Sequence, residues 1–155
     1  MPNTYTQIHL HFVFAVKFRQ RQIQLEWKER LYQYITGIVQ KNGHKLIIVN
    51  GMPDHVHILI GVRPEQSISS LMQDVKSSSS KWINEQKLTP QKFALQEGYG
   101  AFSYSKSQLP RLIKYIENQE EHHRKTTFKE EYLGIMEELR FHTTSNMFSM
   151  NLCKT

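Results

Sequence analysis

The sequence of 155 residues is long enough for one domain with a sizeable hydrophobic core. Its composition, with 39% hydrophobic and 22% charged residues, is that of a globular protein and excludes an intrinsically disordered chain. Lys and Arg number 20 against 14 for Asp and Glu, and the resulting net charge of +6 suits a polyanionic partner, either a nucleic acid or an anionic membrane surface.

Cellular location is indicated by two further features. The single cysteine, Cys153, cannot form an intramolecular disulfide, which is typical of proteins from a reducing compartment. The most apolar stretch near the start, residues 8–16 (IHLHFVFAV), is too short to span a bilayer and carries no small-residue cleavage site. We therefore expect a cytoplasmic protein without a membrane segment.

The first half of the chain alternates strand and helix patterns. Residues 8–16 show strict alternation of apolar positions, which predicts a strand with one apolar face. Residues about 24–42 carry apolar side chains at helical spacing, and Gly43 can end that helix. The apolar positions of the predicted helix are Leu25, Leu31, Ile35, Ile38 and Val39.

The following segments predict a hairpin, a second helix, a strand and a third helix. Residues 44–52 and 55–62 read as strands that pair across a turn containing Pro53. Residues about 67–86 form a helix with Ser67 as its cap, residues 99–105 a short aromatic strand, and residues 107–125 a helix with Pro110 in its first turn.

This β-α-β-β-α-β order, followed by a helix, predicts an α+β protein of the ferredoxin-like or RRM-like class, an antiparallel sheet with helices on one face. We assign residues 1–140 to a single domain and expect the polar residues 141–155 to be a loosely held tail. In the usual strand order the first and third strands are neighbours, which would bring His9 and His11 near His55 and His57.

The third strand carries His55 and His57 one residue apart within an apolar run. Because strand side chains alternate, both imidazoles share a face with Leu59, roughly 7 Å apart at Cα, and can converge on one metal ion. Taken alone, the pattern favours the alternative, two partly exposed histidines that are each hydrogen-bonded locally. The same two interpretations apply to His9 and His11.

The third helix places Tyr115 and Gln119 four residues apart, on one helix face. The amide oxygen of Gln119 can complete a metal site, and the phenol of Tyr115 can attack an electrophile held by the metal. The alternative is a tyrosine that packs its ring and a glutamine in water.

Five segments in this order and spacing resemble the single-tyrosine HUH transposases of the insertion sequence 200/605 group and the related REP-associated tyrosine transposases. The segments, within residues about 4–135, are HLHFVFAVKFR, GMPDHVHILIGV, DVKSSSSKWIN, EGYGAFSYS and YIENQEEHH. The resemblance implies that His55, His57 and Gln119 bind Mg²⁺ or Mn²⁺ and that Tyr115 is the nucleophile. It implies cleavage and rejoining of single-stranded DNA through a 5′-phosphotyrosine, with no nucleotide cofactor.

The resemblance also implies partners: single-stranded DNA with subterminal hairpins, and a second copy of the chain in a homodimer. Candidate phosphate contacts are Lys76, Lys81, Arg111 and Lys114, and aromatic candidates for base stacking are Tyr99, Phe102 and Tyr104. Each of these also fits ordinary surface charge or core packing. The alternative for the whole chain is a non-catalytic or domesticated single-stranded nucleic-acid-binding protein of the same fold.

Overall fold

Four strands form one antiparallel sheet in the part of the chain that the computed structural model describes, residues 4–124 and 126–138. The strand order is β2-β3-β1-β4, so that the first and third strands lie side by side. The strands are β1 (His9–Ala15), β2 (Lys45–Met52), β3 (His55–Gly61) and β4 (Gly100–Tyr104). This topology confirms the predicted ferredoxin-like class.

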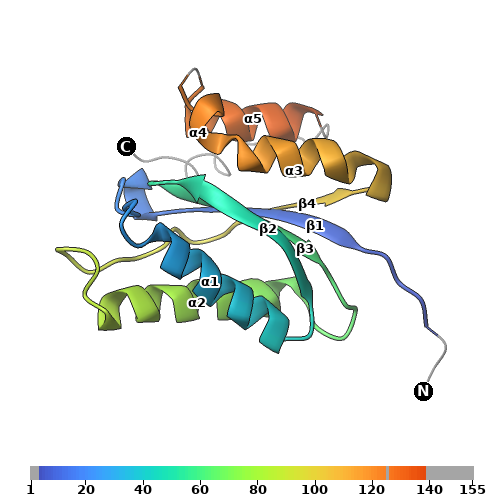
Figure 1. The fold of residues 1–155 in the computed structure, drawn as a ribbon, viewed down its shortest axis with the longest axis horizontal. Coiled ribbons are helices and arrows are strands. Elements are labelled where there is room, and N and C mark those ends of the chain that lie inside the picture. The colour runs from blue at the N-terminus through green and yellow to red at the C-terminus, as the bar shows by residue number, and fades with distance from the viewer. Residues whose placement is uncertain (1–3, 125, 139–155) are drawn as a thin grey trace.

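One face of the sheet is covered by α1 (Lys28–Lys41) and α2 (Ile68–Glu85) (Figure 1). Gly43 follows α1 with φ +87°, and the Ser67 side chain accepts a hydrogen bond from the Ser70 N–H at 3.1 Å, so both predicted helix signals are confirmed. Alternate residues of β1 and β3 form the main core with these helices. Among them are Phe12, Phe14, Val56, Ile58 and Ile60.

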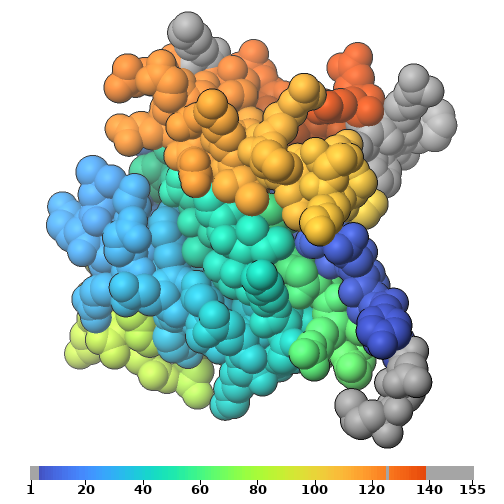
Figure 2. All heavy atoms as spheres, turned by 45° about the vertical axis from the view of Figure 1, so that its right-hand side comes forward, coloured from blue at the N-terminus to red at the C-terminus, as the bar shows by residue number. Residues whose placement is uncertain are grey.

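The opposite face is covered by α3 (Leu109–Glu117), α4 (Gln119–His122) and α5 (Phe128–Glu138) (Figure 1). One cluster of buried side chains joins Val13 and Phe102 of the sheet to α5, and another joins Leu59 to α3. In Figure 2 this second layer, coloured gold to orange, lies along the upper side of the molecule. The histidine face of β3 therefore lies beneath helices rather than open to solvent.

The helices depart from the predictions in several places. Leu25, predicted as an apolar position of the first helix, is 73% exposed, because residues 24–27 form a turn in which the Gln24 carbonyl accepts from the Trp27 N–H, and α1 begins only at Lys28. The expected continuous helix over 107–125 is interrupted at Asn118, which has φ −96° and ψ 28°. The helix α5 was not predicted.

The predicted tail, residues 141–155, lies outside the described residues, and so does the predicted domain limit at residue 140. Among the helices of the described ranges, none has both the length and the apolar character that crossing a membrane requires.

Candidate active site

His55 and His57 project from β3 into the layer of α3, α4 and α5, and both side chains are completely buried. Their rings meet edge to face with centroids 5.1 Å apart. The Phe128 ring of α5 stacks on His55 at 4.2 Å, which fixes the imidazole plane.

The Nδ1 atom of each imidazole is held by a neighbour. His55 Nδ1 lies 2.8 Å from Asp54 Oδ1, and since a carboxylate only accepts, the imidazole donates there. His57 Nδ1 lies 2.8 Å from His11 Nε2, and these two rings stack. Both Nε2 atoms consequently face the space beneath α3 to α5, the orientation that outer partners impose on metal-binding histidines.

Tyr115 and Gln119 reach the same space from above. The Gln119 amide oxygen lies 3.1 Å from His55 Nε2, and its N–H donates to Glu131 Oε2 at 3.0 Å. The Tyr115 hydroxyl also donates to Glu131 Oε2. Its ring stands perpendicular to that of His57 with centroids 5.8 Å apart. The structure thus brings the predicted nucleophile and the predicted metal ligands together, and their roles stay predictions.

The interruption at Asn118 helps to place these two side chains. The side-chain amide of Asn50 on β2 donates to the carbonyl oxygens of Ile116 and Glu117, at 2.9 and 3.1 Å. These carbonyls lie in the last turn of α3, where no further helical N–H is available, so the sheet edge satisfies them. The break lets α4 turn Gln119 inward, where it is completely buried.

Glu131 of α5 is a site residue that the sequence reasoning missed. Its side chain is 1% exposed, and the Nε2 atoms of four imidazoles lie within 3.4 Å of its carboxylate oxygens. These belong to His55, His57, His122 and His123. One signal was available: Phe128, Tyr132, Ile135 and Met136 have the spacing of a buried helix face, and Glu131 lies on that face.

The electrostatics of the cluster are dominated by burial and by this carboxylate. Burial opposes the charged form of Glu131, but hydrogen bonds from His123, His55 and His57 outweigh it and hold the pKa of Glu131 well below its usual range. Burial would lower the pKa of His55, whereas hydrogen bonds to Asp54 and Glu131 raise it to about 9.

Burial keeps three further groups, His57, His11 and Tyr115, in their neutral forms. Burial, only partly offset by Glu131, lowers the pKa of His57, and burial together with His57 lowers the pKa of His11. Burial and then the charge of Glu131 raise the pKa of Tyr115 above its ordinary value of 10.0. Without added positive charge, the tyrosine is therefore a phenol and not a phenolate.

The donor set fits a divalent cation. When His55 is neutral and its Nδ1–H donates to Asp54, the lone pair on Nε2 faces two further acceptors, Gln119 Oε1 at 3.1 Å and Glu131 Oε1 at 3.4 Å. Three acceptor atoms, His55 Nε2 and these two oxygens, would then face one another, which requires either a proton on His55 Nε2 or a cation between them. Adjacent ligands of an octahedral ion with bonds of about 2.1–2.2 Å are separated by about 3.0 Å, close to these distances.

Acidic and imidazole donors form two overlapping groups within the described residues, and in each group the ligand atoms lie within 4.8 Å of one another. The first consists of His55, His57 and Glu131, and the second of His122, His123 and Glu131.

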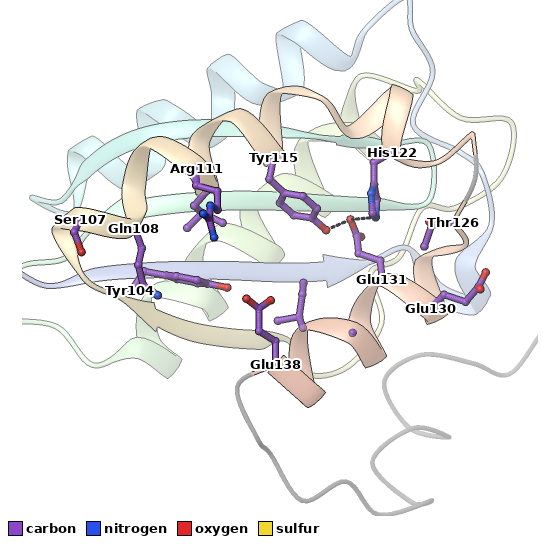
Figure 3. A pocket seen from close by; sticks show the side chains of 13 residues that line it. Tyr104, Ser107, Gln108, Arg111, Tyr115, His122, Thr126, Glu130, Glu131 and Glu138 are labelled. Atoms are coloured by element: carbon purple, nitrogen blue, oxygen red, sulfur yellow. Dashed lines mark hydrogen bonds and ion pairs between the residues drawn. The ribbon is translucent and has the colours of Figure 1, made fainter.

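A groove of about 640 Å³ between α3 and α5 leads to this cluster. Figure 3 shows Tyr115 and His122 directed at Glu131, with Arg111 and Tyr104 further along. The groove is large enough for a nucleotide-sized group. Tyr115 lines it, whereas His55 and His57 are completely buried.

The predicted phosphate contacts separate into two groups. Arg111 lines the groove and Lys114 is exposed on the same helix, whereas Lys76 and Lys81 belong to α2 on the other face of the sheet (Figure 1). The Lys76 ammonium donates to the carbonyl oxygens of Gln96 and Gly98 at 2.6 and 2.7 Å, so it ties α2 to the segment before β4.

The predicted stacking aromatics also separate. Tyr104 lines the groove, while Phe102 is 5% exposed and packs edge to face with Tyr132. Tyr99 packs against Phe12 in the main core. Of these three side chains, Tyr104 is the one that reaches the groove.

Comparison with known proteins places these residues in context. Residues 4–119 match a family model described as "Transposase IS200 like". The chain is 26% identical over 118 residues to the ISDra2 transposase TnpA of Deinococcus radiodurans, which covers 73% of this chain and 84% of that protein. It is 28% identical over 76 residues to the transposase for insertion sequence element IS200 of Salmonella typhimurium, which covers 49% of this chain and 50% of that protein.

Solved structures share the fold. A Deinococcus radiodurans crystal structure described as that of a transposase superposes with a TM-score of 0.63 at 23% identity, over 77% of this chain and 95% of that chain. A REP-associated tyrosine transposase bound to a REP hairpin superposes with a TM-score of 0.62 at 12% identity, over 100% of this chain and 98% of that chain.

Proposed function

The chain belongs to the family of IS200-like transposases, and on that premise we propose that it cleaves and rejoins single-stranded DNA at insertion-sequence ends through Tyr115. The observation that carries this proposal is that the histidine pair and the tyrosine contact the same carboxylate, that of Glu131. The imidazoles of His55 and His57 approach one oxygen of Glu131, and the Tyr115 hydroxyl binds the other.

The proposed step is a transesterification. The Tyr115 oxygen attacks the scissile phosphorus, a tyrosine–phosphate bond forms, and the bond from phosphorus to the 3′ oxygen breaks. The phenol, oriented by its hydrogen bond to Glu131 Oε2, releases its proton to water as the bond to phosphorus forms, and the leaving oxygen takes up a proton from water to become a 3′-OH. Attack by another 3′-OH reverses the step and rejoins DNA, so no nucleotide is consumed.

His55, His57 and Gln119 would hold Mg²⁺ or Mn²⁺, which when bound withdraws charge from the scissile phosphate and orients it. Two imidazoles are softer ligands than Mg²⁺ prefers, so Mn²⁺ would also bind well to this set. Asp54 and His11 orient the two imidazoles, and Gln119 connects His55 with Glu131. The raised pKa of Tyr115 makes added positive charge a requirement for its ionisation.

The groove between α3 and α5 would receive the strand to be cut. Arg111 would contact phosphate there, Tyr104 would stack against a base, and Lys114 would follow the backbone along α3. A transposase of this fold is bound to a REP hairpin, which supports a DNA hairpin as the recognised element. We keep Lys76 and Lys81 as proposed contacts, which a hairpin running along α2 would reach.

The proposal includes a homodimer acting in the cytoplasm. In the structure a single chain places its own Tyr115 beside its own His55 and His57, so catalysis within one chain is geometrically possible, and the dimer would serve to pair two DNA ends.

A non-catalytic nucleic-acid-binding protein of the same fold is the alternative. It needs exposed aromatic side chains on the sheet, whereas this sheet directs buried histidines at a carboxylate and a tyrosine. That arrangement is costly to bury and favours chemistry over simple binding.

The decisive experiment incubates the purified protein with single-stranded DNA from the flanks of its own element and Mn²⁺. A covalent adduct on a denaturing gel is expected from the wild type and from Tyr34→Phe, a matched change on α1. Tyr115→Phe and His57→Ala should form none. An adduct that persists in Tyr115→Phe, or no adduct with any hairpin-flanked strand, would refute the proposal.

A further inference from the structure

We infer that Glu131 is a direct ligand of the catalytic cation as well as the acceptor that orients Tyr115, so that α5 completes the active site. The inference rests on the proposed metal-dependent function. It adds to the predicted ligands an acidic residue from a helix that the sequence did not indicate.

The first reason is the cost of burying Glu131. Its side chain is 1% exposed at the centre of the cluster. An isolated buried carboxylate is strongly unfavourable, and it persists only when paired or bound to a metal. Four imidazole Nε2 atoms, those of His55, His57, His122 and His123, lie within 3.4 Å of its oxygens, so the carboxylate is buried among groups that bind cations.

The second reason is that the two carboxylate oxygens of Glu131 contact different groups. Oε1 lies 3.1 Å from His57 Nε2, 3.4 Å from His55 Nε2 and 3.2 Å from His123 Nε2, the separations of adjacent ligands around one ion. Oε2 instead accepts from the Tyr115 hydroxyl and the Gln119 amide. One carboxylate therefore connects the cation position to the nucleophile.

The third reason is that α5 is anchored in a way that fixes this carboxylate. Phe128 stacks on His55, and Tyr132 packs edge to face against both Phe102 and Phe128. The first turn is capped reciprocally, since the Thr127 N–H donates to Glu130 Oε1 and the Glu130 N–H donates to the Thr127 hydroxyl. A ligand on such a rigid element loses little freedom when it binds.

The opposite role is also physically possible: Glu131 could take the place of the cation and have to be displaced before metal enters. The two roles predict opposite changes in metal affinity. Neutralising a ligand weakens binding, whereas neutralising a competitor leaves binding unchanged or strengthens it.

The test measures Mn²⁺ binding without DNA, from the electron paramagnetic resonance signal of free Mn²⁺, for wild type, Glu131→Gln and Glu137→Gln. Glu137 is exposed on the same helix and serves as the matched control. Replacing a partner one step removed from a metal costs about 10–100-fold in affinity, so neutralising a direct ligand should raise the Kd of Glu131→Gln by at least that much. Glu137→Gln should bind as the wild type does.

Glu131→Asp guards against a folding defect, because it keeps the buried charge and withdraws the oxygen by one methylene. It should melt near the wild-type temperature in EDTA and still bind Mn²⁺ more weakly. Equal or tighter binding by Glu131→Gln, with binding lost in His57→Ala, would overturn the inference and leave the proposed function intact. Absence of Mn²⁺ binding by the wild type would overturn both.

Discussion

Replacement of Asp54 by Asn tests how the histidine pair is prepared for a cation. Asp54 Oδ1 lies 2.8 Å from His55 Nδ1, and its side chain is 16% exposed, so water screens the contact only slightly. The carboxylate keeps the proton on Nδ1 and leaves the Nε2 lone pair directed at the site. An amide can donate to Nδ1 instead, which would favour the tautomer with its proton on Nε2 and block metal binding.

The expected magnitude follows from the kind of bond that is lost. A hydrogen bond to a charged group contributes about 1.5–3 kcal/mol. At about 1.4 kcal/mol per tenfold change, this corresponds to a roughly 10–100-fold rise in the Kd for Mn²⁺. Isothermal titration calorimetry with Mn²⁺ on the DNA-free protein measures this change directly.

Asp74→Asn is the control, because Asp74 of α2 accepts a hydrogen bond from Gln66 on the other face of the sheet and should not influence Mn²⁺ binding. If Asp54→Asn bound Mn²⁺ with wild-type affinity, the tautomer of His55 would not depend on Asp54, and the argument that Asp54 prepares His55 for a cation would be refuted.

Further predictions concern pH, packing and DNA. Because the metal-free protein holds a proton on His55 up to a pKa of about 9 while His57 is already neutral, Mn²⁺ affinity should rise about tenfold per pH unit from neutral pH to about 9 and then level off, with one proton released per ion in calorimetry. The raised pKa of His55 also stabilises the metal-free fold, fully below pH 6.5, and this contribution to the free energy of unfolding is lost as the pH rises through about 9. Thermal melting in EDTA at a series of pH values would detect the loss. Gly51→Ala would place a Cβ 2.2 Å from the His55 carbonyl oxygen and 2.9 Å from Val56 Cα, so it should cost about 3 kcal/mol or more in unfolding free energy. Gly37→Ala in α1 should be neutral or stabilising, because beyond the adjoining helix backbone no atom lies within 4 Å of the new Cβ. Arg111→Ala should weaken single-stranded DNA binding and reduce its salt dependence by about one phosphate contact, while Arg30→Ala on α1 should change neither. If the two variants weakened DNA binding equally, the DNA would not lie in the groove between α3 and α5.

The sheet and its two faces were predictable from the sequence because strand periodicity acts locally. Alternation along residues 8–16 and 55–62 placed Phe12 and Ile58 in the core and His57 on the other face, and the structure confirms these assignments. The order of elements then left the ferredoxin-like topology as the natural arrangement, which placed β1 beside β3 and so brought His11 to His57.

What the sequence did not reveal depends on contacts between distant segments. The break at Asn118 is supported by Asn50, which is remote in the sequence and gives no local signal. Glu131 lies among other acids in residues 128–138, so its residue type alone does not distinguish it. Only its position on the apolar face of α5 sets it apart, and that face becomes visible once the segment is assigned as a helix.

The position of Glu131 on a separate helix has a consequence for control of the reaction. The nucleophile belongs to α3 and the imidazoles to β3, and each contacts a different oxygen of a carboxylate supplied by α5. A shift of α5 therefore moves the Tyr115 acceptor and the cation position together, whereas a shift of α3 moves the nucleophile alone. Since a buried carboxylate without its partners is unfavourable, docking of α5 and assembly of the cluster stabilise each other, which couples the readiness of the tyrosine to the presence of its cation.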